Sequence, residues 1–233
     1  VYLGQMPEEL QVSLSDELTQ LLTDVLGQCN GAPLRLSYIT DAGFHPTEYF
    51  ERVLCRMLDP QRPGEYLEWE WGVDYYHACQ YISNLAQVIF GPGREAYAWA
   101  GKMRRTLKEK RGGVFRVLRS AGQLRAIRGL VGEESDYESA YNYLRRHSPW
   151  MDYAERRRLR VPIGSGVTEA ACKIVFSQRF KCAGMKWGIE SGKPILALRV
   201  IALSGIWAEV RDAMFESQAN EFPQLPANST AQT

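Results

Sequence analysis

The chain has 233 residues, of which 45% are hydrophobic and 24% charged, a globular composition that excludes a collagen-like, coiled-coil or mainly disordered protein. Its net charge of +1 averages two unlike parts. Residues 1–74 hold 13 acids and 4 bases, whereas residues 75–233 hold 14 acids and 24 bases. A basic second part of this kind favours a polyanionic partner, chiefly nucleic acid.

The first 90 residues alternate between helical and strand patterns. Apolar residues at helical spacing predict a helix over 13–26, and alternating apolar and polar residues predict a strand over 34–40. The same criteria predict a helix over 47–58, a strand over 66–73 and a helix over 75–90. Two strand-then-helix units in succession indicate an α/β fold class.

The remainder of the chain is helical in pattern. Residues 91–160 carry no strand signal, and glycines and one proline divide them into helices. A turn over 161–166 precedes a predicted helix over 168–182, and a last helix is predicted over 194–217. Residues 218–233 contain two prolines and few apolar residues, so we expect them to be disordered.

The cysteines and the apolar segments indicate the compartment. Five widely spaced cysteines without a CxxC pair suggest neither a zinc ribbon nor a disulfide framework, as in a reducing cytosol. A zinc site from His77, Cys79 and Cys172 has suitable residue types but lacks ligand spacing. The most apolar stretch, residues 195–210, is too short to span a bilayer, and no export signal begins the chain. We therefore expect a cytoplasmic protein without a membrane partner.

Two acids follow the predicted strands. Asp41 ends the first strand, where a carboxylate is often a metal ligand or acid–base group; the alternative is a turn-forming aspartate. Asp74 follows the second strand and stands three residues before His77, so the two side chains share a helix face and could orient a ligand or transfer protons. The alternative, favoured by local sequence, is an N-cap aspartate with His77 at the edge of the core.

The segment PIGSG at 162–166 is the most distinctive loop. Its two glycines would let backbone N–H groups around Ser165 approach an anion, and the helix that follows favours phosphate. Glu169 lies in the first turn of that helix, where an acid is also favoured by the helix dipole and by pairing with Lys173. The pattern matches neither a nucleophile elbow nor a P-loop.

Basic residues cluster in the second part. Residues 102–128 hold ten lysines and arginines and one acid, with aromatic residues nearby in sequence. Solvated helix faces are the common explanation, but this excess favours contacts with phosphate. The predicted DNA-contacting residues are Lys102, Arg104, Arg105, Lys108, Arg156, Arg157, Arg158, Ser165, Lys173, Arg179 and Lys181.

Four segments carry a family resemblance, in this order: YITDAGFHPTEYF at 38–50, VDYYHACQYI at 73–82, PIGSGVTEAACK at 162–173 and QRFKCAGMKWG at 178–188. Together they resemble the C-terminal catalytic part of bacterial insertion-sequence DDE transposases of the Kra type, which are related to ISL-type and Mutator-like enzymes. The resemblance covers residues 1 to about 211, and PIGSGVTEAACK is its most specific piece.

The resemblance implies a fold and a division of the chain. The family's fold is RNase H-like, with an all-helical insertion before the helix that carries the last catalytic Glu. Residues 1–90 would be a partial core that lacks its N-terminal strands, and residues 91–160 the insertion. Residues 161–217 would complete the core, followed by the disordered tail at 218–233.

The resemblance also implies metal-dependent DNA cleavage and strand transfer. Asp41 matches the second catalytic Asp and Glu169 the catalytic Glu, both as metal ligands, while Asp74 and His77 match the DxxH signature between them. The first catalytic Asp would precede Val1, so little activity is expected from this chain alone. Mg²⁺ or Mn²⁺ would be the cofactor, since hard ions prefer carboxylate oxygens. The partners would be double-stranded DNA of transposon ends and target, bound by a homodimer or larger assembly in the nucleoid.

Two other functions remain open. Asp41, Asp74 and Glu169 could form a complete triad in a stand-alone metal-dependent nuclease. Alternatively, the chain could be a non-catalytic remnant that binds DNA through its basic residues.

Overall fold

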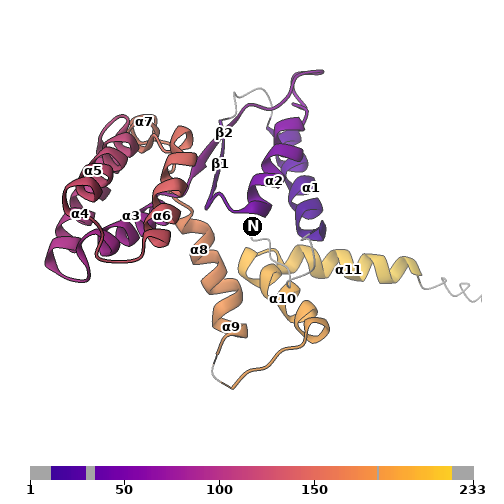
Figure 1. Ribbon diagram of the computed structural model, residues 1–233. Helices are drawn as coiled ribbons and strands as arrows, with labels where there is room; N and C mark the ends of the chain where they lie inside the picture. The colour runs from indigo at the N-terminus through magenta and orange to yellow at the C-terminus, as the bar shows by residue number, and fades with distance from the viewer. Residues whose placement is uncertain (1–11, 30–34, 183, 222–233) are drawn as a thin grey trace, which may run out of the picture. The chain divides into compact units, whose positions relative to one another are not determined.

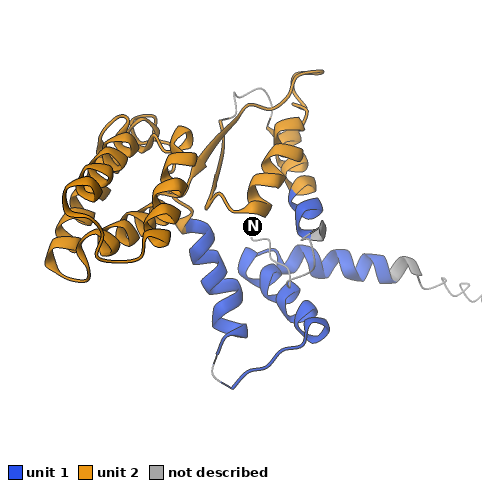
Figure 2. Cartoon of the chain, viewed as in Figure 1, with its two compact units in different colours: residues 1–18, 167–233 blue, residues 19–166 orange. Residues whose placement is uncertain are grey.

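The computed structural model describes residues 12–29, 35–182 and 184–221. The protein is helix-rich, and its two described strands pair in one small sheet, which confirms a helix-rich α/β class. The chain divides into two compact units, one of residues 19–166 and the other of residues 1–18 and 167–233 (Figure 2). Within the described ranges, every helix is too short or too polar to cross a membrane.

The sheet lies in the unit of residues 19–166. Strands β1 (Leu36–Thr40) and β2 (Trp69–Val73) lie side by side (Figure 1) and run parallel. Leu36 lies opposite Trp69, and Thr40 lies opposite Val73. The second strand begins later than predicted, because Tyr66 forms an isolated antiparallel bridge with Leu58 instead of joining β1. The broader RNase H-like fold stays a prediction.

The predicted helix over 47–58 was wrong at both ends. Helix α2 (Phe44–Arg52) begins before Pro46 and is followed by the 3₁₀ turn η2 (Leu54–Arg56). Proline is compatible with the first helical turn, where backbone N–H groups have no partner within the helix, so Pro46 does not mark the boundary. Helix α1 (Val12–Gln28), by contrast, matches its predicted range closely.

Residues 91–160, all of which the structure describes, contain helices and turns and no strand, as predicted. Their elements are α4 (Arg94–Glu109), α5 (Gly113–Arg128), α6 (Glu134–Arg146), η3 (Ser148–Trp150) and α7 (Tyr153–Arg158). Helix α3 (Tyr75–Phe90) has its predicted bounds and packs against α4, α5 and α6 (Figure 1). Residues 19–90 and the predicted insertion at 91–160 therefore belong to one unit, and α3 shares its apolar core with the insertion helices.

That core depends on the spacing of apolar residues in α3. Ala78, Ile82, Leu85 and Ile89 recur every three or four residues and are almost completely buried. Burial of each large aliphatic side chain contributes about 1.5–3 kcal/mol to stability. The packed bundle holds the N-terminus of α3 firmly at the end of β2.

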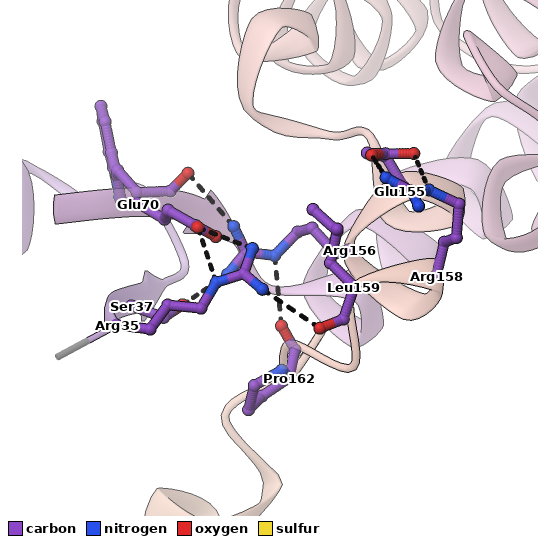
Figure 3. Close-up of polar contacts among 9 residues, drawn as sticks. Arg35, Ser37, Glu70, Glu155, Arg156, Arg158, Leu159 and Pro162 are labelled. Atoms are coloured by element: carbon purple, nitrogen blue, oxygen red, sulfur yellow. Dashed lines mark hydrogen bonds and ion pairs between the residues drawn. The ribbon is translucent and has the colours of Figure 1, made fainter. Parts of the chain in front are cut away.

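A buried arginine joins α7 to the sheet (Figure 3). Arg156 donates from Nε to the Pro162 carbonyl at 3.1 Å and from Nη2 to Ser37 Oγ at 2.6 Å. The guanidinium lies against Gly72, where a Cβ would come within 2.7 Å of Arg156 Cζ. Gly72 is therefore a strand glycine that makes room for this side chain. Beside it, Arg35 pairs with Glu70 at 2.7 Å (Figure 3).

The other unit contains the remaining helices: α8 (Gly166–Cys172), the π-helical turn η4 (Lys173–Ser177), α9 (Gln178–Phe180), α10 (Ile189–Ser204) and α11 (Trp207–Glu221). The single helix predicted over 194–217 was wrong. Gly205 has a φ of 72° and caps α10, so the chain turns before α11 begins. Helix α11 also includes residues 218–221, which were predicted to be disordered; residues 222–233 lie outside the described part.

Candidate functional site

The parallel strands place Asp41 and Asp74 side by side. Thr40 and Val73 are the last paired residues of β1 and β2, and each is followed directly by one of the two acids. The backbone N–H of Asp74 donates to the Thr40 carbonyl at 2.7 Å, which extends the strand pairing by one step. The two acids therefore lie on neighbouring strands at the carboxyl edge of the sheet; the sequence predicts that each follows a strand, and the structure adds that the strands are paired.

Asp41 lies in a tightly bonded and exposed turn. Its Oδ1 accepts from the Gly43 N–H at 2.9 Å, and Thr40 Oγ1 accepts from the Ala42 N–H at 3.1 Å. Ala42 has a φ of 58°, a left-handed conformation that costs free energy for a residue with a Cβ. The turn-forming role of Asp41 is thus confirmed, and its Oδ2 accepts no hydrogen bond from the described residues.

Asp74, in contrast, is buried, and both of its carboxylate oxygens accept hydrogen bonds. Only 2% of its surface is exposed. Its Oδ1 accepts from the His77 backbone N–H at 2.9 Å, which caps α3, and its Oδ2 accepts from the N–H and the hydroxyl of Ser165. Burial alone would raise the pKa of this carboxyl, but the hydrogen bonds from Ser165 and His77 outweigh burial and hold the pKa below its usual range. The N-cap role of Asp74 is confirmed.

The same bonds reveal which anion the PIGSG loop holds in this structure. The Ser165 hydroxyl is 2.5 Å from Asp74 Oδ2, so both donors predicted to contact phosphate point at the chain's own carboxylate. A Cβ on Gly164 would lie 2.9 Å from Tyr76 Cδ2, and the Tyr75 N–H donates to the Ile163 carbonyl at 2.9 Å. The glycine therefore allows the loop to lie directly against the start of α3.

An aromatic cluster adjoins Asp41. The hydroxyl of Tyr143, on α6, donates to the Asp41 carbonyl at 2.8 Å, and its ring stacks on Tyr81 with centroids 3.7 Å apart. The His77 ring meets both tyrosines edge-on, at 5.3 and 5.6 Å. Burial, the neighbouring Tyr81 and the charges of Asp41 and Asp74 raise the pKa of Tyr143, so its hydroxyl remains a donor at neutral pH.

His147 completes this cluster from the C-terminal end of α6. Its Nδ1 donates to the Tyr143 carbonyl at 2.9 Å, and burial lowers its pKa, which favours the neutral imidazole near pH 7. Sequence reasoning missed Tyr81, Tyr143 and His147. The available signal was weak: Tyr81 stands one helical turn after His77, and Tyr143 one turn before His147.

The described residues do not by themselves fit a metal site. No group of three or more His, Cys, Asp or Glu side chains in the described ranges is arranged to hold an ion, and this includes His77, Cys79 and Cys172. Asp74 has both oxygens engaged, which leaves Asp41 as the open carboxylate at the sheet edge. Glu169 is exposed in the first turn of α8 and belongs to the unit of residues 1–18 and 167–233.

The predicted DNA-contacting lysines and arginines of the larger unit fall into two groups. Lys102 and Arg105 are exposed on α4, where they line a cavity of about 290 Å³ together with Lys110, and Arg157 is exposed on α7. The other four are engaged in the protein: Arg104 with the Ser83 hydroxyl, Lys108 over the Tyr75 ring, Arg156 at the sheet and Arg158 with Glu155.

The remaining basic candidates belong to the smaller unit. Lys173 and Lys181 are exposed, and the guanidinium of Arg179 lies over the Trp187 ring at 5.4 Å.

No known protein-family model matches the chain, and the searches of curated proteins and of solved structures gave no significant match.

Proposed function

We propose that this chain is the catalytic part of a DDE-type transposase with an RNase H-like core, which cleaves DNA and transfers strands with Mg²⁺ or Mn²⁺. The observation that carries the proposal is the juxtaposition of Asp41 and Asp74 at the carboxyl ends of two parallel strands. Open α/β sheets place their catalytic groups at such an edge. The four ordered segments of the family resemblance supply the chemistry.

The roles of the acids differ. Asp41 is the proposed metal ligand at the sheet edge, because its carboxylate is exposed and Oδ2 is available. Glu169 is the proposed second ligand, from the resemblance. Asp74 is a positioning residue: it caps α3 and holds Ser165, four residues before Glu169, through two hydrogen bonds.

This division argues against the stand-alone nuclease. That function requires Asp74 as a metal ligand, yet its carboxylate already accepts three protein hydrogen bonds, and loss of a buried donor's partner costs about 1–3 kcal/mol each. The DNA-binding remnant remains a second candidate, since Lys102 and Arg105 are exposed and have no ion-pair partner in the part of the chain that the structure describes.

The proposed partner is double-stranded DNA, bound by a dimer or larger assembly. Duplex binding should weaken linearly in a plot of log affinity against log salt, with a slope of about −0.9 per neutralised phosphate. Lys102→Ala and Arg105→Ala should each reduce that slope by about one. Arg104→Ala is the matched control, because its side chain is engaged with Ser83.

Metal binding distinguishes the transposase from the DNA-binding remnant. In titrations of the full chain with Mn²⁺, Asp41→Asn and Glu169→Gln should each weaken binding by roughly tenfold or more. Glu68→Gln, which removes an exposed acid outside the sheet edge, is the control and should bind as the wild type does. Equal Mn²⁺ affinity in Asp41→Asn and wild type would overturn the catalytic assignment and favour the remnant.

A further inference from the structure

A cavity of about 510 Å³ opens beside the Asp41 turn, within the unit of residues 19–166. Its wall begins at Ala42 and Gly43, directly after Asp41, and continues along α2 from Phe44. Trp71 of β2 and Trp150 of η3 line it as well. The cavity thus combines large aromatic surfaces with immediate proximity to the proposed metal ligand.

Trp150 is part of a continuous ladder of aromatic rings. Tyr38 stacks on Phe50 with centroids 5.8 Å apart, Phe50 on Trp71 at 5.1 Å, and Trp71 meets Trp150 at 4.6 Å. Trp150 is 36% exposed and lies 6.3 Å from the His147 ring, and both rings line the cavity, so both present aromatic surface to it. A planar aromatic group that entered the cavity would extend the ladder by one ring, an arrangement that aromatic quadrupoles favour.

The charges around the cavity select among planar ligands. Glu48 pairs with Arg52 at 2.9 Å, and Glu51 lies exposed beside them, so the α2 wall repels a bare anion. Carboxylates do accept hydrogen bonds from the exocyclic amino groups of nucleobases. Arg146, at the end of α6, is exposed on the lining and offers a contact for a phosphate outside the cavity.

The shape requires the base to be unpaired. A base inside a duplex presents only its edge in a groove, and an enzyme pocket receives its face only after the nucleotide leaves the stack or is already single-stranded. A cavity of about 510 Å³ has the size of a small-molecule site and accommodates one nucleotide, not a base pair with its neighbours.

We propose that this cavity binds one unpaired nucleobase of a DNA strand, stacked on Trp150, with the adjoining phosphate near Arg146. The proposal rests on the proposed function in taking DNA as the ligand, and it adds a site for single-stranded DNA next to Asp41. Stacking on an aromatic side chain changes affinity by about 5- to 150-fold per base.

The test is a fluorescence titration of the full chain with a single-stranded 12-mer that carries one 2-aminopurine. Trp150→Ala should weaken binding by about 5- to 150-fold and remove the change in 2-aminopurine emission, whereas Trp150→Phe should retain most of both. Phe44→Ala, a change at a side chain that is 75% exposed, repeats the test at a second wall without disturbing the ladder. Tyr97→Ala removes an equally exposed aromatic outside the cavity and should bind as the wild type does.

Three results would overturn the proposal: wild-type affinity in both Trp150→Ala and Phe44→Ala, the same emission change with a fully paired duplex, or binding of dAMP as tight as that of the 12-mer. The last result would assign the cavity to free nucleotides. Because Mn²⁺ is absent from this titration, an unchanged Mn²⁺ affinity in Asp41→Asn would refute the catalytic function without affecting the base site.

Discussion

Asp74 allows a quantitative test of the hydrogen bonding at the sheet edge. Asp74→Ala removes the N-cap of α3, a change that costs about 1 kcal/mol on its own. It also leaves the partly buried N–H of Ser165 without an acceptor, for which about 1–3 kcal/mol is typical. The Ser165 hydroxyl can rotate and adds little. We therefore expect a loss of about 2–4 kcal/mol, and a fall in Tm of about 5–15 °C for a chain of this size.

Urea unfolding monitored by tryptophan fluorescence measures this loss, with two variants as controls. Asp74→Asn keeps an oxygen for the His77 cap but places an amide beside the Ser165 donors, so its loss should be intermediate. Ser165→Ala removes a single hydroxyl donor and should cost least. The expected order of destabilisation is Asp74→Ala, Asp74→Asn, Ser165→Ala.

The hydrogen bonds of Asp74 also make the stability of the wild type depend on pH. The folded-state pKa of Asp74 lies below its value in the unfolded chain, which is about 3.9. Its stabilisation is therefore complete above about pH 4 and disappears as the pH falls through the folded-state pKa. The Asp74→Asn side chain does not titrate, so the difference in free energy of unfolding between this variant and the wild type should become smaller at acidic pH. A difference that stayed constant from pH 7 to pH 3, or wild-type stability in Asp74→Ala, would refute the reasoning.

Three further predictions concern neighbouring side chains. Arg156→Ala should lower the urea midpoint of unfolding and leave the salt slope of DNA binding unchanged. Arg157→Ala should reduce that slope by about 0.9 without loss of stability. A reduced slope in Arg156→Ala with an unchanged urea midpoint would contradict the buried role of Arg156. Gly72→Ala should cost about 1–3 kcal/mol in urea unfolding, and clearly less in the Arg156→Ala background, where the clash is absent. Tyr143→Phe should cost about 1 kcal/mol and weaken Mn²⁺ binding at Asp41; unchanged Mn²⁺ affinity would argue against a positioning role for its hydroxyl.

The sequence was sufficient to predict the ends of a helix where residues next to each end determine them. Helix α3 was predicted with its observed bounds because Asp74 caps it and Gly91 follows it with a φ of 72°. Pro46 and Gly205 show the limit of such signals. Proline is allowed both before and within a first helical turn, and glycine both inside and at the end of a helix, so tertiary packing decides between them.

The positions of Asp41 and Asp74 at strand ends were predictable, whereas their partners were not. Adjacent strand ends bring Asp41 and Asp74 together, and this follows from the order of the elements once the strands are parallel. The Gly-Ser-Gly pattern identified donors for an anion but not which anion they bind, which in the structure is Asp74. The contact of Tyr143 with Asp41 left no signal in the sequence, because it spans 102 residues.

The excess of basic residues in the second part of the chain overstates the number of cations that are available to DNA. Several arginines of the basic second part serve the fold: Arg156 binds oxygens at the sheet, Arg125 pairs with Glu134 and Glu138, and Arg199 donates to the carbonyls of Ile174 and Val175. A cation already bonded to protein oxygens releases few counterions from DNA. The number of phosphates that the chain contacts should therefore follow its exposed cations, and residue counts overstate it. This is why paired variants such as Arg156→Ala and Arg157→Ala are more informative about DNA binding than net charge.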